Sequence, residues 1–147
     1  MRVRYSFSSR RTGHTENIRK QRAKFPDLIK EVVNTSDILL EILDARFFGE
    51  TRNLKIEELI KQMGKKIIFV LNKSDLIDLK KIKKELELAG LYPYVFVSCA
   101  LRRGGRELRN KIKIETKRLK KSRNGTEIEK DSEKEPKINI GVIGYPN

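Results

Sequence analysis

Four short polar stretches of this 147-residue chain follow apolar runs and carry groups suited to binding a nucleotide. They are Asp44-Ala45-Arg46, Asn72-Lys73-Ser74-Asp75, Ser98-Cys99-Ala100 and Gly144-Tyr145-Pro146-Asn147. In an open sheet of parallel strands, ligands bind beyond the carboxyl ends of the strands. If the apolar runs are such strands, the four stretches lie along one rim of the sheet, and that rim is the candidate site.

The stretch 72–75 has the chemistry that guanine recognition requires. The Watson–Crick edge of guanine presents two adjacent N–H donors, and the carboxylate of Asp75 can accept both. Adenine presents an acceptor there, so it would leave the carboxylate unpaired, which is costly. The stem of Lys73 can lie on the face of the base, and the amide of Asn72 can both donate and accept. Taken alone, the same residue types are also common in polar turns.

The stretches at 98–100 and 44–46 are less specific by themselves. Backbone N–H groups at Cys99 or Ala100 can donate to the carbonyl of guanine, but an ordinary strand-to-helix turn has the same composition. Taken alone, Asp44 is better interpreted as a polar residue at a strand end, and Arg46 and Arg52 as surface charges.

The stretch 144–147 matches the start of a phosphate-binding loop. Such a loop reads G-x-x-x-x-G-K-[ST] after a strand, and its backbone N–H groups cradle phosphates. Gly144 fits the first glycine, and Tyr145, Pro146 and Asn147 fit variable positions. The second glycine, the lysine and the Ser/Thr would fall beyond residue 147.

Apolar periodicity predicts the elements that position these stretches. Short buried strands are expected at 37–45, 66–73, 94–98 and 138–143, and helices at 25–34, 54–63, 79–89 and 104–121. Gly64 and Gly90 are the stop signals of two of the helices. Strands that alternate with helices predict the α/β class, an open parallel sheet with flanking helices.

The formal net charge of +14 is concentrated in two places. Residues 1–24 form a basic arm of net charge +7, and residues 111–121 of one predicted helix carry +5. Basic segments outside a core commonly bind phosphate backbones, because neutralising phosphates releases counterions. This favours a nucleic-acid partner over a merely solvated surface. Residues 122–136 are polar without an apolar period and predict a linker.

Composition argues against several other classes. With Cys99 as the single cysteine, no disulfide forms within the chain, which fits a reducing cytoplasm. No apolar run is long enough to span a membrane, so we expect no membrane partner. His14 is the only histidine and lies in the arm, so neither a histidine-centred catalytic site nor a metal site is expected. No G-x-G-x-x-G motif opens a helix, which argues against a dinucleotide site.

Together, the four stretches resemble the circularly permuted GTPases of the YlqF/YawG kind over roughly residues 25–147. In that family a D-A-R strand comes first, then N-K-x-D, a short S-A motif, a linker and finally a phosphate loop that begins GYPN. The order and spacing here are the same. Phe48 stands where the family often has proline, although Thr51-Arg52-Asn53 matches the usual continuation. Either Cys99 replaces the family's alanine, or a shift of one residue makes Ala100 that alanine.

The resemblance implies a GTP-binding protein that acts in assembly of the large ribosomal subunit, with ribosomal RNA as partner. It implies that Asn72 and Asp75 read guanine, that Lys73 packs on the base, and that residues 98–100 support the base carbonyl. Residues 144–147 would begin the phosphate cradle. The resemblance also implies a P-loop GTPase-like sheet, permuted and incomplete in this chain, with the strand at 138–143 beside the strand at 38–43.

Four parts of the chain are thus expected. They are the arm 1–24, a guanine-recognition part 25–121, the linker 122–136 and the start of the phosphate-loop half 137–147. GTP or GDP would be the ligand, whereas Mg²⁺ would be held only by the intact protein. No catalytic residue is expected in these 147 residues. Two alternatives remain open: an RNA-binding α/β module without nucleotide hydrolysis, and a domain that binds another nucleotide or a phosphopeptide.

Overall fold

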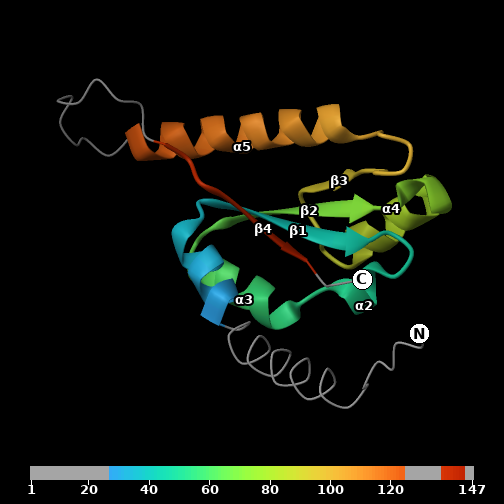
Figure 1. Cartoon of the computed structure of the whole chain (residues 1–147), viewed down its shortest axis with the longest axis horizontal. Helices are drawn as coiled ribbons and strands as arrows, with labels where there is room; N and C mark the ends of the chain where they lie inside the picture. Colours follow the sequence, from blue (N-terminus) through green and yellow to red (C-terminus); the bar gives the residue numbers. More distant parts are fainter. Residues whose placement is uncertain (1–26, 125–136, 145–147) are drawn as a thin grey trace, which may run out of the picture. The chain divides into compact units, whose positions relative to one another are not determined.

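The computed structural model describes residues 27–124 and 137–144 (Figure 1). Its elements are β1 (Ile38–Asp44), α2 (Phe48–Thr51), α3 (Leu54–Gln62), β2 (Lys66–Asn72), a 3₁₀ turn (Ser74–Leu76), α4 (Leu79–Leu88), β3 (Tyr94–Phe96), α5 (Gly105–Asn124) and β4 (Ile140–Gly144). Residues 27–35 are helical, as predicted, and residues 27–34 belong to a unit separate from the one that begins at Thr35.

The four strands form one parallel sheet in the order β3-β2-β1-β4. This confirms the predicted α/β class and the expected place of the last strand beside the first. β1 lies in the interior of the sheet and is apolar at five of its seven positions, because its two faces are both covered. In β4, by contrast, buried and exposed residues alternate, which is typical of an edge strand.

The amino-terminal ends of β1 and β4 are tied together across about a hundred residues of sequence. The backbone N–H of Asp37 donates to the carbonyl of Asn139 at 2.8 Å, and the N–H of Asn139 donates to the carboxylate of Asp37 at 2.8 Å. The side-chain amide of Asn139 also donates to the carbonyl of Thr35. These bonds set the register in which Ile38 lies opposite Ile140.

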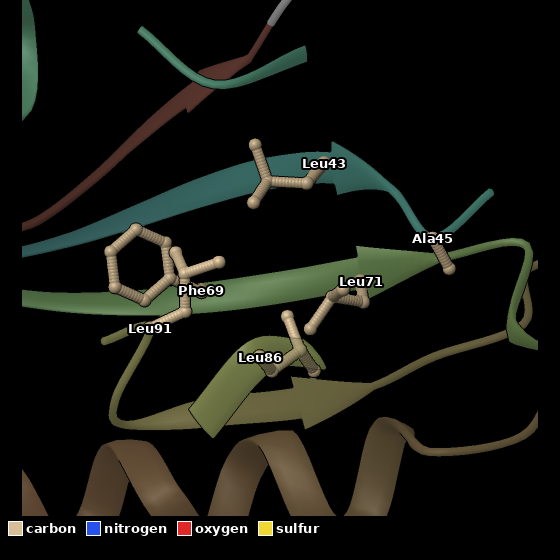
Figure 2. Close-up of a cluster of buried hydrophobic side chains, with 6 residues drawn as sticks. All are labelled: Leu43, Ala45, Phe69, Leu71, Leu86 and Leu91. Carbon is tan, nitrogen blue, oxygen red and sulfur yellow. The ribbon is translucent and has the colours of Figure 1, made fainter. Parts of the chain in front are cut away.

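Each face of the sheet has its own apolar cluster. One cluster packs α4 and the loop after it against β1 and β2 (Figure 2), and its buried members are Leu43, Ala45, Phe69, Leu71, Leu86 and Leu91. The other cluster lies under α5, where Leu108, Ile112 and Leu119 contact the opposite sides of the strands. In Figure 1, α5 and α3 lie on opposite sides of the sheet.

Several element boundaries differ from the predicted ones. α5 continues to Asn124, three residues beyond the predicted end, because no glycine or proline occurs before Gly125. β3 ends at Phe96, although the N–H of Val97 still donates to the carbonyl of Leu71 at 2.8 Å. The short α2 and the 3₁₀ turn were not predicted, because single turns carry no apolar period. None of the described helices is long and apolar enough to cross a membrane.

Leu86 and Leu88 of α4 provide a matched test of the first cluster. Leu86 is 0% exposed and Leu88 is 88% exposed. We expect Leu86→Ala to lower the free energy of unfolding by about 2–5 kcal/mol, because it removes buried methyl groups and leaves a cavity. Leu88→Ala should change it by less than about 0.5 kcal/mol. Urea unfolding followed by circular dichroism measures both values, and equal effects would contradict the packing of α4.

Candidate functional site

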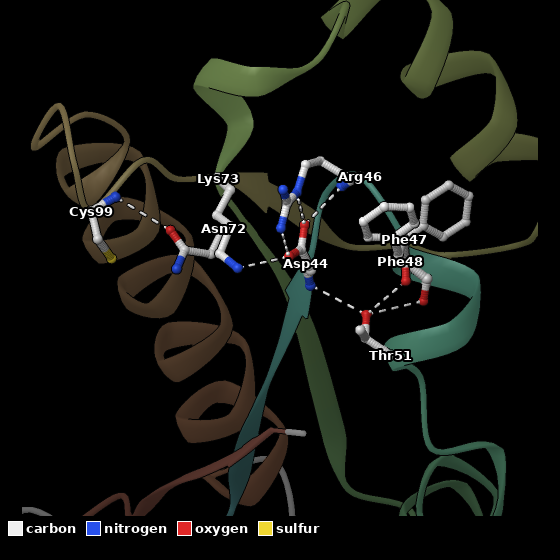
Figure 3. A network of polar contacts seen from close by, with 8 residues as sticks. All are labelled: Asp44, Arg46, Phe47, Phe48, Thr51, Asn72, Lys73 and Cys99. Carbon is white, nitrogen blue, oxygen red and sulfur yellow. Dashed lines mark hydrogen bonds and ion pairs between the residues drawn. The ribbon is translucent and has the colours of Figure 1, made fainter. Parts of the chain in front are cut away.

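The parallel pairing places Asp44 directly opposite Asn72, at the carboxyl ends of β1 and β2. Around this pair, Asp44, Arg46 and Lys73 form one polar network, and Asn72 contacts Cys99 (Figure 3). The structure therefore brings three of the predicted stretches to a common rim. Gly144 ends β4 beside Ile42, on the other side of β1. Tyr145, Pro146 and Asn147 lie outside the described residues.

Asp44 is the centre of the polar network. Its carboxylate is nearly buried and accepts hydrogen bonds from Arg46 Nε at 3.0 Å, Arg46 Nη2 at 2.8 Å and Lys73 Nζ at 2.9 Å. Hydrogen bonds from Arg46, followed by the one from Lys73, hold the pKa of Asp44 well below its ordinary value. Arg46 and Lys73 are about one-third exposed, so the ion pairs lie at the border between the sheet and solvent.

The backbone around Asp44 is held by a second set of bonds. The N–H of Asp44 donates to the hydroxyl of Thr51 at 3.2 Å, and that hydroxyl donates to the carbonyl of Phe47 at 3.0 Å. The N–H of Arg46 donates back to the carboxylate of Asp44 at 3.0 Å. The loop that leaves β1 therefore folds over its own aspartate, and α2 is the turn that closes it.

Lys73 has a left-handed backbone conformation, with φ of 62° and ψ of 31°. This conformation is uncommon for a residue with a side chain, and such positions cluster at functional sites. In this conformation the chain turns sharply after β2, and the ammonium group meets Asp44. The sequence predicted that Lys73 packs on a base; its partner in the structure is a carboxylate one strand away.

The stretches at 72–75 and 98–100 are joined by two hydrogen bonds. The hydroxyl of Ser98 donates to the carboxylate of Asp75, and the N–H of Cys99 donates to the side-chain oxygen of Asn72 at 3.2 Å. Ser98 is buried, whereas Asp75 is exposed. The backbone N–H of Cys99 is therefore already hydrogen-bonded to Asn72. The backbone N–H of Ala100 has no hydrogen-bond partner within the part of the chain that the structure describes.

The loop from Ser98 to Gly104 fixes Ser98 beneath Asp75. Ser98 and Arg103 exchange backbone hydrogen bonds of 3.1 and 3.0 Å, and the N–H of Leu101 donates to the hydroxyl of Ser98. Gly104 closes this loop with φ of 82°, and a Cβ there would lie 2.1 Å from the carbonyl oxygen of Phe96. Only glycine fits at this position, so the loop geometry depends on it.

Two buried carboxylates on the α3 side of the sheet support the segment after Asp44. Arg52 donates to both oxygens of Glu57, at 2.8 and 2.7 Å. The N–H of Asn53 donates to Glu41 Oε1 at 3.0 Å, and the other oxygen of Glu41 has no partner among the described residues. Burial raises the pKa of Glu41 to about 7, although the bond from Asn53 opposes the shift. At neutral pH this carboxyl group is thus partly protonated.

Sequence reasoning missed the roles of Glu41 and Glu57. Nothing in the local sequence marks Glu57 as buried, yet it lies against Arg52 with only 2% of its surface exposed. Glu41 stands alone in the apolar run Ile38–Leu43, and a charged residue in a strand covered on both faces signals a specific partner.

The described residues contain no group of three His, Cys, Asp or Glu side chains able to hold a metal ion. The groups available at the rim are the exposed carboxylate of Asp75, the side-chain amide of Asn72, the backbone N–H of Ala100 and the ammonium of Lys73. This set suits a planar ligand with adjacent N–H donors and a carbonyl.

Comparison with known proteins agrees with this chemistry. The chain is 35% identical over 130 residues to the uncharacterized GTP-binding protein MJ1464 of Methanocaldococcus jannaschii, and the match covers 88% of this chain. This relative is a GTP-binding protein, as are the two that follow. The nuclear GTP-binding protein NUG1 of Saccharomyces cerevisiae is 31% identical over 92% of this chain. The human guanine nucleotide-binding protein-like 3 is 32% identical over 81% of it.

The matched region is a minor part of each relative. It spans 31% of the Methanocaldococcus protein, 26% of the yeast protein and 24% of the human protein. No protein-family model matches the sequence.

Glu41→Gln should change how stability depends on pH. Because the pKa of Glu41 is raised in the folded state, the folded protein loses stability as pH rises from about 4.5 to about 7, by up to about 3 kcal/mol. Glutamine can still accept from Asn53 and carries no charge. We therefore expect the variant to gain stability relative to wild type at about pH 8 but not at about pH 5. Urea midpoints at both pH values measure this, with Glu58→Gln on the exposed side of α3 as the control.

Asp44→Asn should have the opposite pH signature. The lowered pKa of Asp44 means that its ion pairs stabilise the folded state above about pH 4 and are lost as pH falls below that value. We expect the variant to be about 1–3 kcal/mol less stable than wild type at neutral pH, and the difference to shrink in acid. Asp78→Asn, at an exposed position, is the control. A difference that stays constant down to about pH 3 would contradict the network.

Proposed function

We propose that this chain is the guanine-recognition part of a circularly permuted GTPase that acts in assembly of the large ribosomal subunit. The observation that carries the proposal is the joining of residues 72–75 to residues 98–100 at the carboxyl ends of parallel strands. Relatives that are GTP-binding proteins support guanine nucleotide as the ligand.

In this proposal Asp75 accepts the two N–H donors of guanine, and Ser98 holds its carboxylate in place. The Ala100 N–H donates to the base carbonyl, because Cys99 would have to release Asn72 to do so. Asn72 contributes its amide to the base edge. The stem of Lys73 packs on the face of the base while Asp44 anchors its ammonium group.

Gly144 to Asn147 would begin the phosphate cradle. A Cβ at Gly144 would lie 3.2 Å from the Cβ of Ile42, so this position favours glycine as the phosphate-loop assignment requires. Phosphoryl transfer in GTPases depends on a loop lysine, Mg²⁺ and a positioned water. Since the motif positions for that lysine and for the Mg²⁺-binding Ser/Thr lie beyond residue 147, we expect weak guanine binding and no GTP hydrolysis by this chain alone.

Ribosomal RNA is the proposed macromolecular partner, in the cytoplasm. The excess of positive charge at residues 1–24 and 111–121 supports it. The same charge supports the second candidate, an RNA-binding α/β module without nucleotide chemistry. The two candidates differ in whether guanine nucleotides bind at residues 72–75.

An NMR titration with GDP and with ADP tests guanine recognition in this chain. We expect GDP at millimolar concentration to shift the amide signals of residues 72–76 and 98–100, and ADP to shift them much less. Asp75→Asn should remove most of the preference for GDP, because the amide presents a donor to a donor on the base.

Asp78→Asn is the matched control, since it is the same change three residues away at a helix cap that asparagine also fills. It should preserve the preference for GDP. If Asp75→Asn left GDP and ADP shifts as different as they are in wild type, guanine recognition by Asp75 would be wrong. Equal shifts with both nucleotides in the wild-type chain would favour the RNA-binding module.

A further inference from the structure

The outer face of α5 carries a stripe of five cations, Arg106, Arg109, Lys113, Lys117 and Lys121. Their spacing of three, four, four and four residues keeps them on one side of the helix over a length of about 22 Å. All five are exposed. The stripe lies opposite the face on which Leu108, Ile112 and Leu119 pack against the sheet.

The stripe contains one sign of charge only. Neither acidic residue of α5 lies in it, since Glu115 is buried beside Arg118 and Glu107 lines a pocket with Tyr92. Within the described residues, no ion pair forms to any of the five cations. Three successive pairs four residues apart therefore repel one another, which destabilises a helix.

The other long helices of the chain do not share this pattern. In α4, Lys81 and Lys83 are each followed four residues later by a glutamate. In α3, the exposed Glu58 lies three residues after Lys55 and three residues before Lys61. A helix face that serves only solubility mixes both signs, as these two do. A single-signed stripe is therefore better explained by a polyanionic partner.

We infer that the stripe on α5 is a docking surface for the phosphate backbone of double-stranded RNA. The choice of RNA as partner rests on the proposed function, and the surface itself rests on the geometry of α5. A membrane is disfavoured, because Leu108, Ile112 and Leu119 pack against the sheet and the exposed Ile114 alone does not make an apolar face that could insert into lipid. An acidic protein is disfavoured, because the stripe has no aromatic or aliphatic anchor of the kind on which protein interfaces centre.

The absence of aromatic residues from the stripe also selects the form of the RNA. Single-stranded RNA is bound by stacking its bases on aromatic side chains, whereas duplex RNA is recognised by shape and backbone contacts. The stripe should therefore bind duplexes with little regard to sequence, and with a strong dependence on salt.

The test replaces all five stripe cations by glutamine in the full 147-residue chain, which retains residues 1–24. The control variant removes five other exposed lysines, Lys61, Lys80, Lys81, Lys83 and Lys84, so that both variants have the same net charge. Fluorescence anisotropy with two RNA duplexes of unrelated sequence, at several salt concentrations, gives the affinity and its salt slope.

We expect the stripe variant to bind both duplexes more than about tenfold more weakly than the control variant. We expect the magnitude of its salt slope to fall by about four, given about 0.9 for each lost phosphate contact. Its melting temperature should equal or exceed that of wild type, because glutamine keeps helix propensity and the like-charge repulsion is gone. Loss of binding without loss of fold is the signature of a docking surface.

Equal affinities and slopes for the two variants would overturn the inference, as would a wild-type chain that does not bind the duplexes. Parallel measurements with phosphatidylserine vesicles and with polyglutamate test the other polyanions. If the stripe substitutions weakened binding to either of these and left duplex binding unchanged, the assigned partner would be wrong. The GDP titration is repeated on both variants, so that failure of guanine recognition and failure of the stripe are seen separately.

Discussion

The parallel pairing of β1 with β2 and with β4 is the constraint on which the site depends. Parallel strands bring all their carboxyl ends to one rim, so residues far apart in sequence become neighbours there. Asp44 lies opposite Asn72 for this reason alone. The bonds between Asp37 and Asn139 at the other end of the sheet hold β4 in the same alignment. The rim is therefore set by hydrogen bonding that is remote from it.

Glu41 and Asp44 show how environment decides the charge of a carboxyl group. They are three residues apart in one strand, and both are nearly buried. Asp44 has two cationic partners, and its pKa is lowered; Glu41 has one backbone N–H partner, and its pKa is raised to about 7. Burial penalises both charges, but only at the rim do cations donate hydrogen bonds to the carboxylate and outweigh that penalty. Within three residues, β1 thus changes from a strand of the core to a strand that carries the site.

Most of the fold could be predicted from sequence. Buried parallel strands appear there as continuous apolar runs, and helices appear as apolar residues that recur every three or four positions. The place of β4 followed from the family resemblance, since periodicity carries no information about strand order. The ion pair between Lys73 and Asp44 could not be predicted, because it depends on the left-handed conformation of a lysine. The buried roles of Glu41 and Glu57 depend in the same way on tertiary contacts that no local pattern reports.

The energetics of α5 explain how one helix can carry so uniform a charge. Three like-charged pairs four residues apart cost roughly 1 kcal/mol in total. Leu108, Ile112 and Leu119 pack on the sheet, and even partial burial of three such side chains contributes a few kcal/mol. Helices in proteins are stabilised mainly by tertiary packing. The inner face of α5 thus holds the helix in place, which leaves the composition of its outer face free to serve binding at little cost to the fold.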